Sequence, residues 1–336
     1  MISKIIATGS CVPDICLTNE ALSQWMETSD EWIRSRTGIG ARRLAAMPEP
    51  DANGCIRTHY GDSPLFTLAR EAAKRALSMA EAQKGLAPED VDLILVATSS
   101  HDELFPALAC RLQEALGLSR AAGYDIVLAC TGFLAALQMA DAYIRAGVYR
   151  TVLVIGAEVL SRFVDWEDRD TAILFGDGAG AVVMSADPGH TEDGAGILGT
   201  VLHADGAGAD ALTGRAMYWN ERMPAAIRMD GRAVFSFAVR RVPEVIRELL
   251  AGEGLRPDLY LLHQANYRII ETIAKKLQEP MEKFPHNLER FGNTSAASIP
   301  LLMDELNRSG SLKKGQLLCL AGFGAGLSYG AALLRW

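Results

Sequence analysis

Hydrophobic runs and amphipathic segments alternate along the first half of the chain. Short runs rich in Val, Ile and Leu, typical of buried strands, occupy residues 92–98, 125–129 and 151–156. Between them, residues 106–117 and 131–146 repeat apolar side chains every three or four positions, as helices do. Strands and helices that alternate in this way predict a layered α/β fold.

The second half returns to the same order of elements. A strand is expected at 259–262 and a helix over 266–277, whose isoleucines fall on one face. A small-residue loop follows, then a helix around 296–308 and a strand at 317–320. The two halves are therefore expected to be built alike.

Two glycine-rich stretches support this parallel. Gly-Asp-Gly-Ala-Gly-Ala-Val-Val-Met at 176–184 has the rhythm of Gly-Ala-Gly-Leu-Ser-Tyr-Gly-Ala-Ala-Leu at 324–333. We predict an internal duplication, with one half at residues 1–190 and the other at 191–336, joined by a polar break near 186–196.

Composition and charge narrow the class of protein. The chain has 336 residues, 49% of them hydrophobic, which is enough for a large core. It contains no uncharged apolar run of about eighteen residues, and the strand-like run at 1–10 is too short for a signal peptide. We therefore expect a cytoplasmic protein without a membrane partner. A net charge of −8 disfavours nucleic acid, because phosphate binding requires a dense basic surface.

Two further segments are expected at the surface. The stretch 47–63, which contains Pro and Gly, is interpreted as a loop or excursion of unassigned purpose. The cluster Arg34, Arg36, Arg42 and Arg43 is interpreted as a solvated charged face.

The six cysteines show no metal-binding spacing. Without a C-x-x-C pair or nearby histidines they do not suggest zinc, so no metal is expected, and most are predicted to pack as small buried side chains. They are Cys11, Cys16, Cys55, Cys110, Cys130 and Cys319. Cys319 lies on the last predicted strand and is interpreted as a core residue.

Cys130 differs from the others because it lies between a predicted strand and a predicted helix. The free N–H groups and positive dipole end of a helix favour a thiolate, so this position predicts a lowered thiol pKa and a competent nucleophile. The small neighbours Ala129 and Gly132 leave room for a substrate carbonyl. A cysteine that merely packs fits the local pattern equally well.

Two further polar residues follow predicted strands. His263 comes directly after the strand at 259–262, and Asn293 lies in the loop before the helix around 296–308. Taken singly, His263 fits a structural histidine and Asn293 fits a helix cap. Because functional side chains gather at the ends of strands, these two residues and Cys130 together indicate a covalent thioester enzyme.

Seven short motifs occur in order along the chain. They are TSDEWI at 28–33, RTGI at 36–39, ACTGF at 129–133, FGDGAG at 175–180, HQAN at 263–266, GNTSAAS at 292–298 and GFGAG at 322–326. Through these motifs the chain resembles, nearly end to end, the β-ketoacyl-[acyl-carrier-protein] synthase III family, which initiates bacterial fatty-acid synthesis. The resemblance implies a homodimer with a thiolase fold, in which two similar α/β halves form five αβαβα layers.

The same resemblance implies a reaction. Cys130 is expected to take an acyl group, acetyl or another short chain, from acyl-CoA. Malonyl-[acyl-carrier protein] (malonyl-ACP) then loses carbon dioxide and attacks the acyl-cysteine, giving β-ketoacyl-ACP. His263 and Asn293 are implied to stabilise the thioester oxygen as neutral donors. CoA takes part as a substrate, so no cofactor is expected.

The acyl oxygen is implied to bind the backbone N–H groups of Cys130 and Ala325. The family usually has glycine at the position of Ala325, and alanine narrows the allowed backbone angles.

Three further groups of residues are assigned by the resemblance alone. The implied CoA-binding residues, with Trp32 stacked on adenine, are Thr28, Trp32, Arg36, Thr37, Arg169, Gly231 and Asn266. The implied acyl pocket, with Phe105 reaching across the dimer, comprises Phe105, Leu160, Phe235 and Phe323. The implied surface for the acidic carrier protein comprises Gln264, Arg268, Lys275 and Lys276, near a family lysine that is Ser236 here.

Parts of this pattern also occur in other classes of protein. The motif at 322–326 follows a strand and loosely suggests a dinucleotide loop, but strand-like residues follow it where a helix is required. Elongating synthases have a second histidine in place of Asn293, and thiolases have a second reactive cysteine. An intact cysteine, histidine and asparagine also argue against a non-catalytic carrier-binding homologue. An acyltransferase acting on an alcohol or amine, or a starter synthase of secondary metabolism, stays open, and so does the length of the starter chain.

Overall fold

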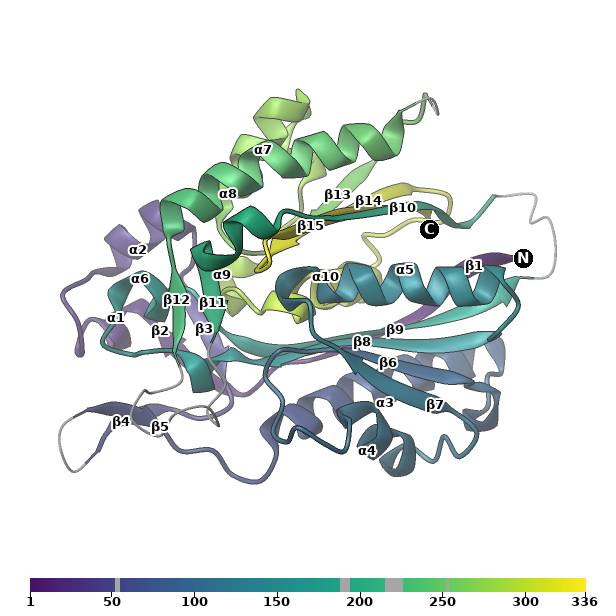
Figure 1. Ribbon diagram of the computed structural model, residues 1–336, viewed down its shortest axis with the longest axis horizontal. Coiled ribbons are helices and arrows are strands. Elements are labelled where there is room, and N and C mark those ends of the chain that lie inside the picture. The colour runs from purple at the N-terminus through teal and green to yellow at the C-terminus, as the bar shows by residue number, and fades with distance from the viewer. Residues whose placement is uncertain (52–54, 188–193, 215–225, 252–253) are drawn as a thin grey trace.

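Two mixed β-sheets lie between layers of helices, so that five layers alternate as helix, sheet, helix, sheet, helix (Figure 1). The computed structural model describes residues 1–51, 55–187, 194–214, 226–251 and 254–336. The layering is the one that the sequence predicts. The predicted boundary between residues 190 and 191 lies outside the described residues.

The first sheet has the strand order β1-β9-β8-β6-β7. Its strands are β1 (Ile2–Cys11), β6 (Leu93–Ala97), β7 (Ala122–Ile126), β8 (Thr151–Val159) and β9 (Asp177–Asp187). Strand β6 runs parallel to β7 and β8, whereas β9 runs antiparallel to β8 and β1. Strand β7 therefore ends the sheet, and the chain leaves it there toward Cys130.

The second sheet repeats this arrangement in the order β10-β15-β14-β13. Its strands are β10 (Gly196–Ala204), β13 (Leu259–Leu262), β14 (Leu317–Gly324) and β15 (Ser328–Arg335). Strand β13 is parallel to β14, and β15 is antiparallel to β14 and β10. Each strand thus has a counterpart in the first sheet, and the two glycine-rich stretches lead into the matching strands β9 and β15.

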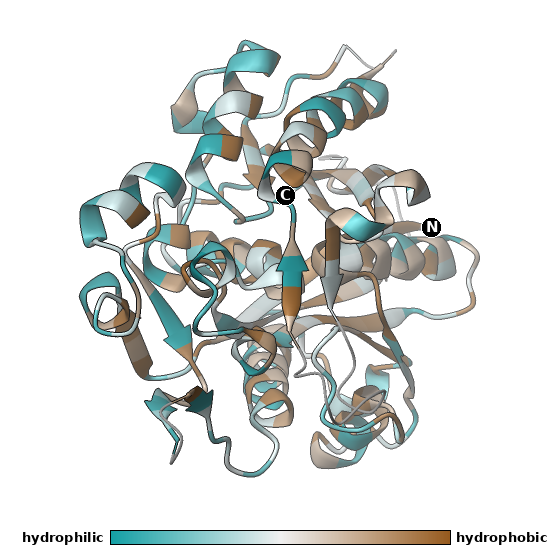
Figure 2. Cartoon of the chain, turned by 60° about the vertical axis from the view of Figure 1, so that its left-hand side comes forward, coloured by the Kyte–Doolittle hydropathy of each residue, from teal (hydrophilic) through white to brown (hydrophobic). Residues whose placement is uncertain are grey.

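Helix composition follows position among the layers. The central layer contains α5 (Gly132–Arg145) and α10 (Ser298–Arg308), and α5 is apolar on most of its surface because both faces are covered. The outer helices are α3 (Pro64–Lys84), α4 (Leu108–Ala115), α7 (Gly231–Leu250) and α8 (Tyr267–Leu277). Figure 2 shows hydrophilic residues on these outer helices and hydrophobic residues toward the sheets. Helices α3 and α7 were not predicted from the sequence.

Short elements connect the layers. The helices among them are α1 (Asn19–Leu22), α2 (Asp30–Thr37), α6 (Arg169–Ala172) and α9 (Leu288–Phe291). The strands are β2 (Ile15–Thr18), β3 (Ala41–Leu44), β4 (Pro48–Pro50), β5 (Ile56–Thr58), β11 (Leu212–Gly214) and β12 (Ile227–Met229). The 3-10 helices are η1 (Pro88–Asp90), η2 (Ala129–Thr131), η3 (Leu160–Phe163), η4 (Gly206–Ala211), η5 (Met281–Lys283) and η6 (Ser295–Ala297). The predicted excursion at 47–63 contains the antiparallel pair β4 and β5.

Two predictions about local structure were wrong. The strand expected at 125–129 ends at Ile126, because Val127 is 69% exposed and Ala129 takes a φ of +44°, which turns the chain out of the sheet. Arg42 is fully buried and is not part of a solvated face.

Most cysteines also differ from the prediction. Cys16 and Cys110 are exposed and Cys11 and Cys55 are half-buried, so only Cys130 and Cys319 are buried. In the part of the chain that the structure describes, no helix combines the length and apolar character that crossing a bilayer requires.

Candidate active site

Cys130 lies where the first sheet meets the central layer. After β7 the chain turns through η2, which contains Cys130, and continues directly into α5. Ala129 has a φ of +44°, a conformation uncommon for residues other than glycine, so the turn before Cys130 is sharp. The predicted position between a strand and a helix is confirmed.

The predicted lowering of the Cys130 pKa is wrong for this structure. The side chain is only 8% exposed, and burial raises the pKa of the thiol to about 12. The interaction with the Ser295 side chain lowers this pKa, but the loss of water around the thiolate raises it by more. In this structure the sulfur is therefore a neutral thiol, and its proton must be removed during acylation.

His263 directly follows the last residue of β13, and its backbone N–H donates to the Ala321 carbonyl at 2.9 Å. Its side chain is 2% exposed, and Nδ1 lies 2.7 Å from Oγ of Ser298. Burial lowers the pKa of His263 to about 3. The imidazole is thus neutral at physiological pH.

The backbone of Asn293 is held on both sides by the segment before β9. Its N–H donates to the Leu174 carbonyl at 2.8 Å, and its carbonyl accepts from the Gly176 N–H at 3.0 Å. The side-chain Oδ1 accepts the Ser295 N–H at 2.9 Å. Because this bond fixes the oxygen end of the amide, the Nδ2 end is the one that can donate to a substrate.

The loop 293–298 and the end of β14 bring the three residues together. The segment η6, which contains Ser295, packs against η2, and the Ser295 side chain lowers the pKa of the Cys130 thiol. The Ser295 N–H orients Asn293, and Ser298 hydrogen-bonds to His263. The glycines of β14 permit this close approach. A Cβ at residue 324 would lie 2.9 Å from the Cys130 nitrogen, and one at residue 322 would lie 3.1 Å from Cβ of His263.

Ala325 follows these glycines in the turn between β14 and β15. The described residues other than glycine with positive φ are Ser63, Ala129, Gln278 and Ser295. Ala325 is absent from that set, so alanine fits here without left-handed strain. The departure from glycine therefore leaves the backbone N–H of residue 325 usable as a donor.

Trp32 is the centre of the predicted CoA group. The guanidinium carbon of Arg169 lies 4.7 Å from the centroid of the Trp32 ring, and that of Arg36 lies 5.6 Å away. Asn266 caps α8 and donates from Nδ2 to the Arg36 carbonyl at 3.1 Å, which joins α8 to α2.

The other predicted CoA residues differ in their surroundings. Oγ1 of Thr28 is buried without a partner. Thr37 is 3% exposed, and its hydroxyl bonds the Ile33 carbonyl and the Ile39 N–H within the chain. Gly231 is exposed at the start of α7.

Three of the four predicted pocket residues share one core. Leu160 and Phe323 are buried in the same hydrophobic cluster, and Phe235 packs against it. Phe105 lies elsewhere and is 79% exposed. A phenylalanine this exposed is consistent with a contact outside its own chain.

The residues predicted to bind the carrier protein differ in their exposure to solvent. Arg268, Lys275 and Lys276 are exposed on α8. Gln264 is 1% exposed, donates to the Leu262 carbonyl at 2.7 Å and accepts the Asn287 N–H at 3.1 Å. With its amide engaged internally, Gln264 is not available to a docking partner, and its assignment is corrected.

Sequence reasoning missed the residues that support the three candidates. Ser295 and Ser298 belong to the motif GNTSAAS, but no spacing rule identified them as partners of Cys130 and His263. Glu158 is the only charged residue in the apolar strand Thr151–Val159. A single carboxylate in such a strand is a signal that could have been used.

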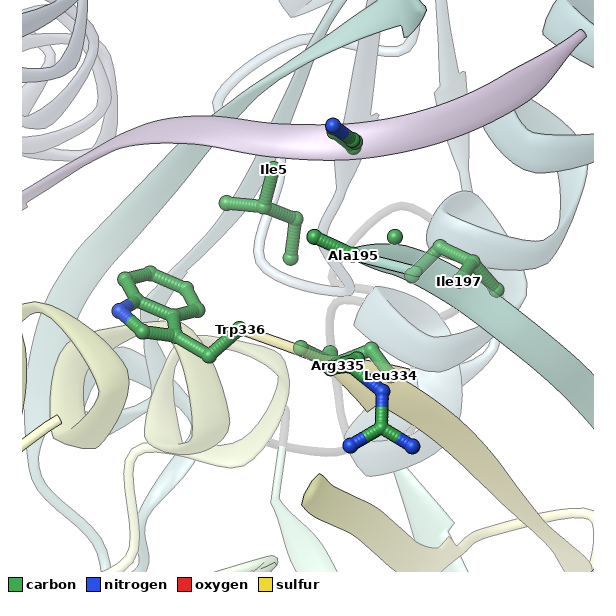
Figure 3. A pocket seen from close by; sticks show the side chains of 8 residues that line it. Ile5, Ala195, Ile197, Leu334, Arg335 and Trp336 are labelled. Carbon is green, nitrogen blue, oxygen red and sulfur yellow. The ribbon is translucent and has the colours of Figure 1, made fainter. Parts of the chain in front are cut away.

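A surface hollow lies outside the candidate site. Figure 3 shows a hollow where β1, β10 and β15 meet, lined by Ile5, Ile197, Leu334 and Trp336 among others, and no candidate residue lines it. Among the residues described, no three His, Cys, Asp or Glu side chains are placed to hold a metal ion.

The five layers, with a buried cysteine before a central helix, define the class of thiolase-fold condensing enzymes. Models of 3-oxoacyl-[acyl-carrier-protein] synthase III match residues 124–206, and models of its C-terminal region match residues 256–336. The β-ketoacyl-[acyl-carrier-protein] synthase III of Microcystis aeruginosa is 46% identical, over 99% of this chain and 97% of that protein.

Solved structures agree. The 3-oxoacyl-[acyl-carrier-protein] synthase III of Aquifex aeolicus superposes with a TM-score of 0.88 at 42% identity, covering 99% of this chain and 100% of that one. The priming β-ketosynthase of the R1128 polyketide pathway gives 0.87 at 34% identity, covering 99% and 96%. The chain belongs to the β-ketoacyl-[acyl-carrier-protein] synthase III family, as its motifs indicated.

Proposed function

We propose that this chain joins an acyl group from acyl-CoA to malonyl-ACP, with Cys130, His263 and Asn293 performing the chemistry. The products are β-ketoacyl-ACP, CoA and carbon dioxide, and the reaction initiates fatty-acid synthesis. The observation that carries the proposal is the pair of buried neutral donors, His263 and Asn293, joined to the cysteine loop through one segment, residues 293–298.

The first half-reaction transfers the acyl group to Cys130. The sulfur attacks the thioester carbonyl of acyl-CoA, and the bond between that carbonyl and the CoA sulfur breaks. The backbone N–H groups of Cys130 and Ala325 stabilise the oxyanion, a role supported by the closeness of β14 to the Cys130 nitrogen. The dipole of α5 adds positive potential at the same place.

The second half-reaction uses His263 and Asn293. Loss of carbon dioxide from the malonyl group places negative charge on the thioester oxygen, which two hydrogen-bond donors stabilise. Ser298 accepts the Gln264 N–H at 3.4 Å and lies 2.7 Å from Nδ1 of His263, and we propose that the Ser298 proton is directed to that nitrogen. Nε2 then carries the ring proton, and it donates together with Nδ2 of Asn293.

Substrate binding follows from the surrounding residues. Trp32, Arg36 and Arg169 offer flat aromatic and guanidinium surfaces that suit the adenine of CoA. Leu160, Phe235 and Phe323 supply an apolar lining for the acyl chain. Exposed Arg268, Lys275 and Lys276 give α8 a positive surface for an acidic carrier protein.

We also propose a homodimer. Strand β7 is the last strand of its sheet, and its edge together with Leu104, Phe105 and Val127, which are 82%, 79% and 69% exposed, provides an apolar surface. Pairing of β7 with its copy would cover these residues and bring Phe105 toward the partner's acyl pocket.

The test is acylation followed by condensation. A panel of acyl-CoA thioesters is incubated with the protein, and intact mass with peptide mapping locates any acyl group. Acylation is expected at Cys130 and is expected to disappear in Cys130→Ala, whereas Cys319→Ala serves as the matched control. An acyl group on another cysteine would overturn the assignment.

Addition of malonyl-ACP to the acylated protein then separates synthase from acyltransferase. Release of carbon dioxide and formation of β-ketoacyl-ACP are expected. Transfer of the acyl group to an alcohol or amine, without carbon dioxide release, would instead support the acyltransferase alternative.

A further inference from the structure

Glu158 is a buried carboxylate without a role in the reaction proposed above. It lies near the end of β8 and has no exposed surface. An unpaired charge in the interior is strongly unfavourable, so such a residue requires compensating contacts. Its contacts lead to Cys130.

The alternation of side chains along β8 sets the direction of Glu158. Val152 and Val154 pack in the core between the two sheets, whereas Leu153 and Ile155 pack in the separate core that contains α3. Because side chains alternate between faces, Glu158 shares the inner face with Val154. Between them, a Cβ at Gly156 would lie 2.2 Å from the Ala296 carbonyl oxygen, so η6 lies directly over this end of β8.

Hydrogen-bond donors surround the carboxylate. It accepts the Ser99 N–H at 3.2 and 3.1 Å, the Ser100 hydroxyl at 2.6 Å and the Ser295 hydroxyl at 3.2 Å. These bonds stabilise the ionised form, yet burial outweighs them and raises the pKa of Glu158 to about 7. Near neutral pH the group can therefore gain or lose a proton.

Ser295 connects Glu158 to the nucleophile. Its hydroxyl donates to Glu158, and η6, which contains Ser295, packs directly against η2, which contains Cys130. The Ser295 side chain lies close enough to the thiol to lower the pKa of Cys130. With its proton directed at the carboxylate, the Ser295 oxygen has a lone pair available for the thiol S–H. A positive φ of 49° holds Ser295 in this position, and its N–H also orients Asn293.

We propose that Ser295 relays the thiol proton of Cys130 to Glu158 when acyl-CoA acylates the cysteine. This inference rests on the proposed function. As the bond between sulfur and the acyl carbon forms, the thiol proton passes to the Ser295 oxygen and the Ser295 proton passes to Glu158. The bond from the acyl carbon to the CoA sulfur breaks, and the CoA thiolate takes a proton back from Glu158 by the reverse route. The step is balanced without another reactant.

His263 is not suited to accept this proton. Its Nδ1 is bonded to Ser298, and burial lowers the pKa of its ring to about 3. Glu158 therefore acts in the acylation step, and His263 acts in the decarboxylation step.

The segments around Glu158 are the loop after β6, η2, η3, η6 and β9. His101, in the loop after β6, favours the ionised carboxylate, whereas η2 contributes Cys130. Arg162, on η3, donates to the carbonyls of Ser100 and His101. The segment η6 contributes the Ser295 hydroxyl and no titratable side chain. Asp177 on β9 pairs with Val159, and paired residues share a face of the sheet. Because Val159 is the neighbour of Glu158 along β8, Asp177 lies on the opposite face from Glu158.

The test is the rate of a single acylation turnover between pH 6 and 9, measured by quenched mass spectrometry with the acyl-CoA that acylates the wild type fastest. The variants are Glu158→Gln, Ser295→Ala and Glu158→Asp. Asp177→Asn is the matched control, because Asp177 is an equally buried carboxylate whose bonds go to Ala45 and Ser161.

The wild-type rate is expected to rise through an inflection near pH 7. Glu158→Gln and Ser295→Ala should lose the inflection and react about 100-fold more slowly at neutral pH, with the deficit shrinking as hydroxide removes the thiol proton directly. Glu158→Asp keeps the carboxylate and should retain the inflection. Asp177→Asn should keep the wild-type profile even if its melting temperature falls.

A wild-type rate and profile in Glu158→Gln would overturn the relay. So would a loss of rate that keeps the inflection, or one matched by Asp177→Asn, since either result would indicate a purely structural role. If the wild-type protein is not acylated at Cys130 by any thioester, the proposed function itself fails, and the two failures are thereby distinguished.

Discussion

Oγ of Ser298 lies 2.7 Å from Nδ1 of His263, and both side chains are buried. A buried neutral imidazole can hold its proton on either nitrogen, and the group bonded to one nitrogen determines the state of the other. Ser298 therefore decides whether His263 presents a donor or an acceptor to the malonyl thioester.

Ser298→Ala should impair decarboxylation while leaving acylation intact. Without the hydroxyl, the Nδ1 proton form is no longer disfavoured and Nε2 loses its role as a donor. Carbon dioxide release from malonyl-ACP should fall at least about tenfold, because misplaced tautomers cost between one and several orders of magnitude. Acylation of Cys130 by acyl-CoA, measured by mass, should be unchanged. Ser298→Thr, which keeps the hydroxyl, is the control, and an equal loss in both half-reactions would contradict the prediction.

The stability of the protein should depend on His263 in acid. The unfolded chain protonates this residue near its ordinary pKa of 6.5, but the folded chain protonates it only near 3. Between these values the unfolded state binds more protons, so stability falls as pH falls, by up to about 1.4 kcal/mol per pH unit.

Urea unfolding of His263→Gln measures this contribution. Its free energy of unfolding should decline less steeply than that of the wild type between pH 6.5 and 4.5. Glu158 and Asp177 have raised pKa values and act with the opposite sign, since their contribution is lost as pH rises, but they are present in both proteins. Equal slopes for the two proteins would refute the assignment of a buried neutral histidine.

Arg42→Lys should lower the stability of the protein. It should also lower the decarboxylation rate, because Arg42 anchors the segment that positions Asn293. The buried guanidinium donates to the Leu17 and Ile173 carbonyls, and Ile173 begins the segment that holds the backbone of Asn293. The two carbonyls are reached from different guanidinium nitrogens, and a lysine, which donates from a single nitrogen, cannot occupy both positions. Each carbonyl left unpaired costs about 1–3 kcal/mol. Thermal unfolding of Arg43→Lys, the adjacent and less buried arginine, should shift far less. Similar shifts in both variants would contradict this role.

Arg169→Ala should weaken acyl-CoA binding. The guanidinium lies against Trp32, and losing a cation–π surface costs about 1 kcal/mol or more, so KM for acyl-CoA should rise roughly tenfold. KM for malonyl-ACP should stay constant, because the carrier protein presents no adenine. Arg34→Ala removes the same charge from α2 without a contact to Trp32 and should leave both values near wild type. A change in the malonyl-ACP value alone would count against the assignment.

Val127→Asp should disrupt the proposed dimer. Val127 is 69% exposed directly after the edge strand β7, where a charge would be desolvated by a partner. Sedimentation should show twice 36.2 kDa for the wild type and a shift toward 36.2 kDa for the variant. Val148→Asp alters a valine that is 60% exposed elsewhere and should leave the mass unchanged. A wild-type protein that sediments as a monomer would refute the dimer.

Much of the fold could be predicted because it depends on local periodicity. The alternation of apolar runs and amphipathic segments placed β6, β8, α5, β13 and β14 correctly, and the similar glycine-rich stretches anticipated two sheets of matching order. The end of β7 was misjudged, since Val127 is apolar but exposed. Apolar character predicts a strand without indicating where the chain leaves the sheet.

Sequence by itself determined the reactive residue types, their order and their positions at strand ends, and so it was enough to identify the family and to single out Cys130, His263 and Asn293. Only the tertiary structure decided their state. The surroundings of these three side chains are formed by β8, β14 and the loop 293–298. These segments are far apart in the sequence and meet only in the folded protein. That meeting buries Cys130 and His263, withdraws Gln264 from the surface and joins Glu158 to Ser295, because solvent exclusion and hydrogen-bond geometry arise only when those segments pack.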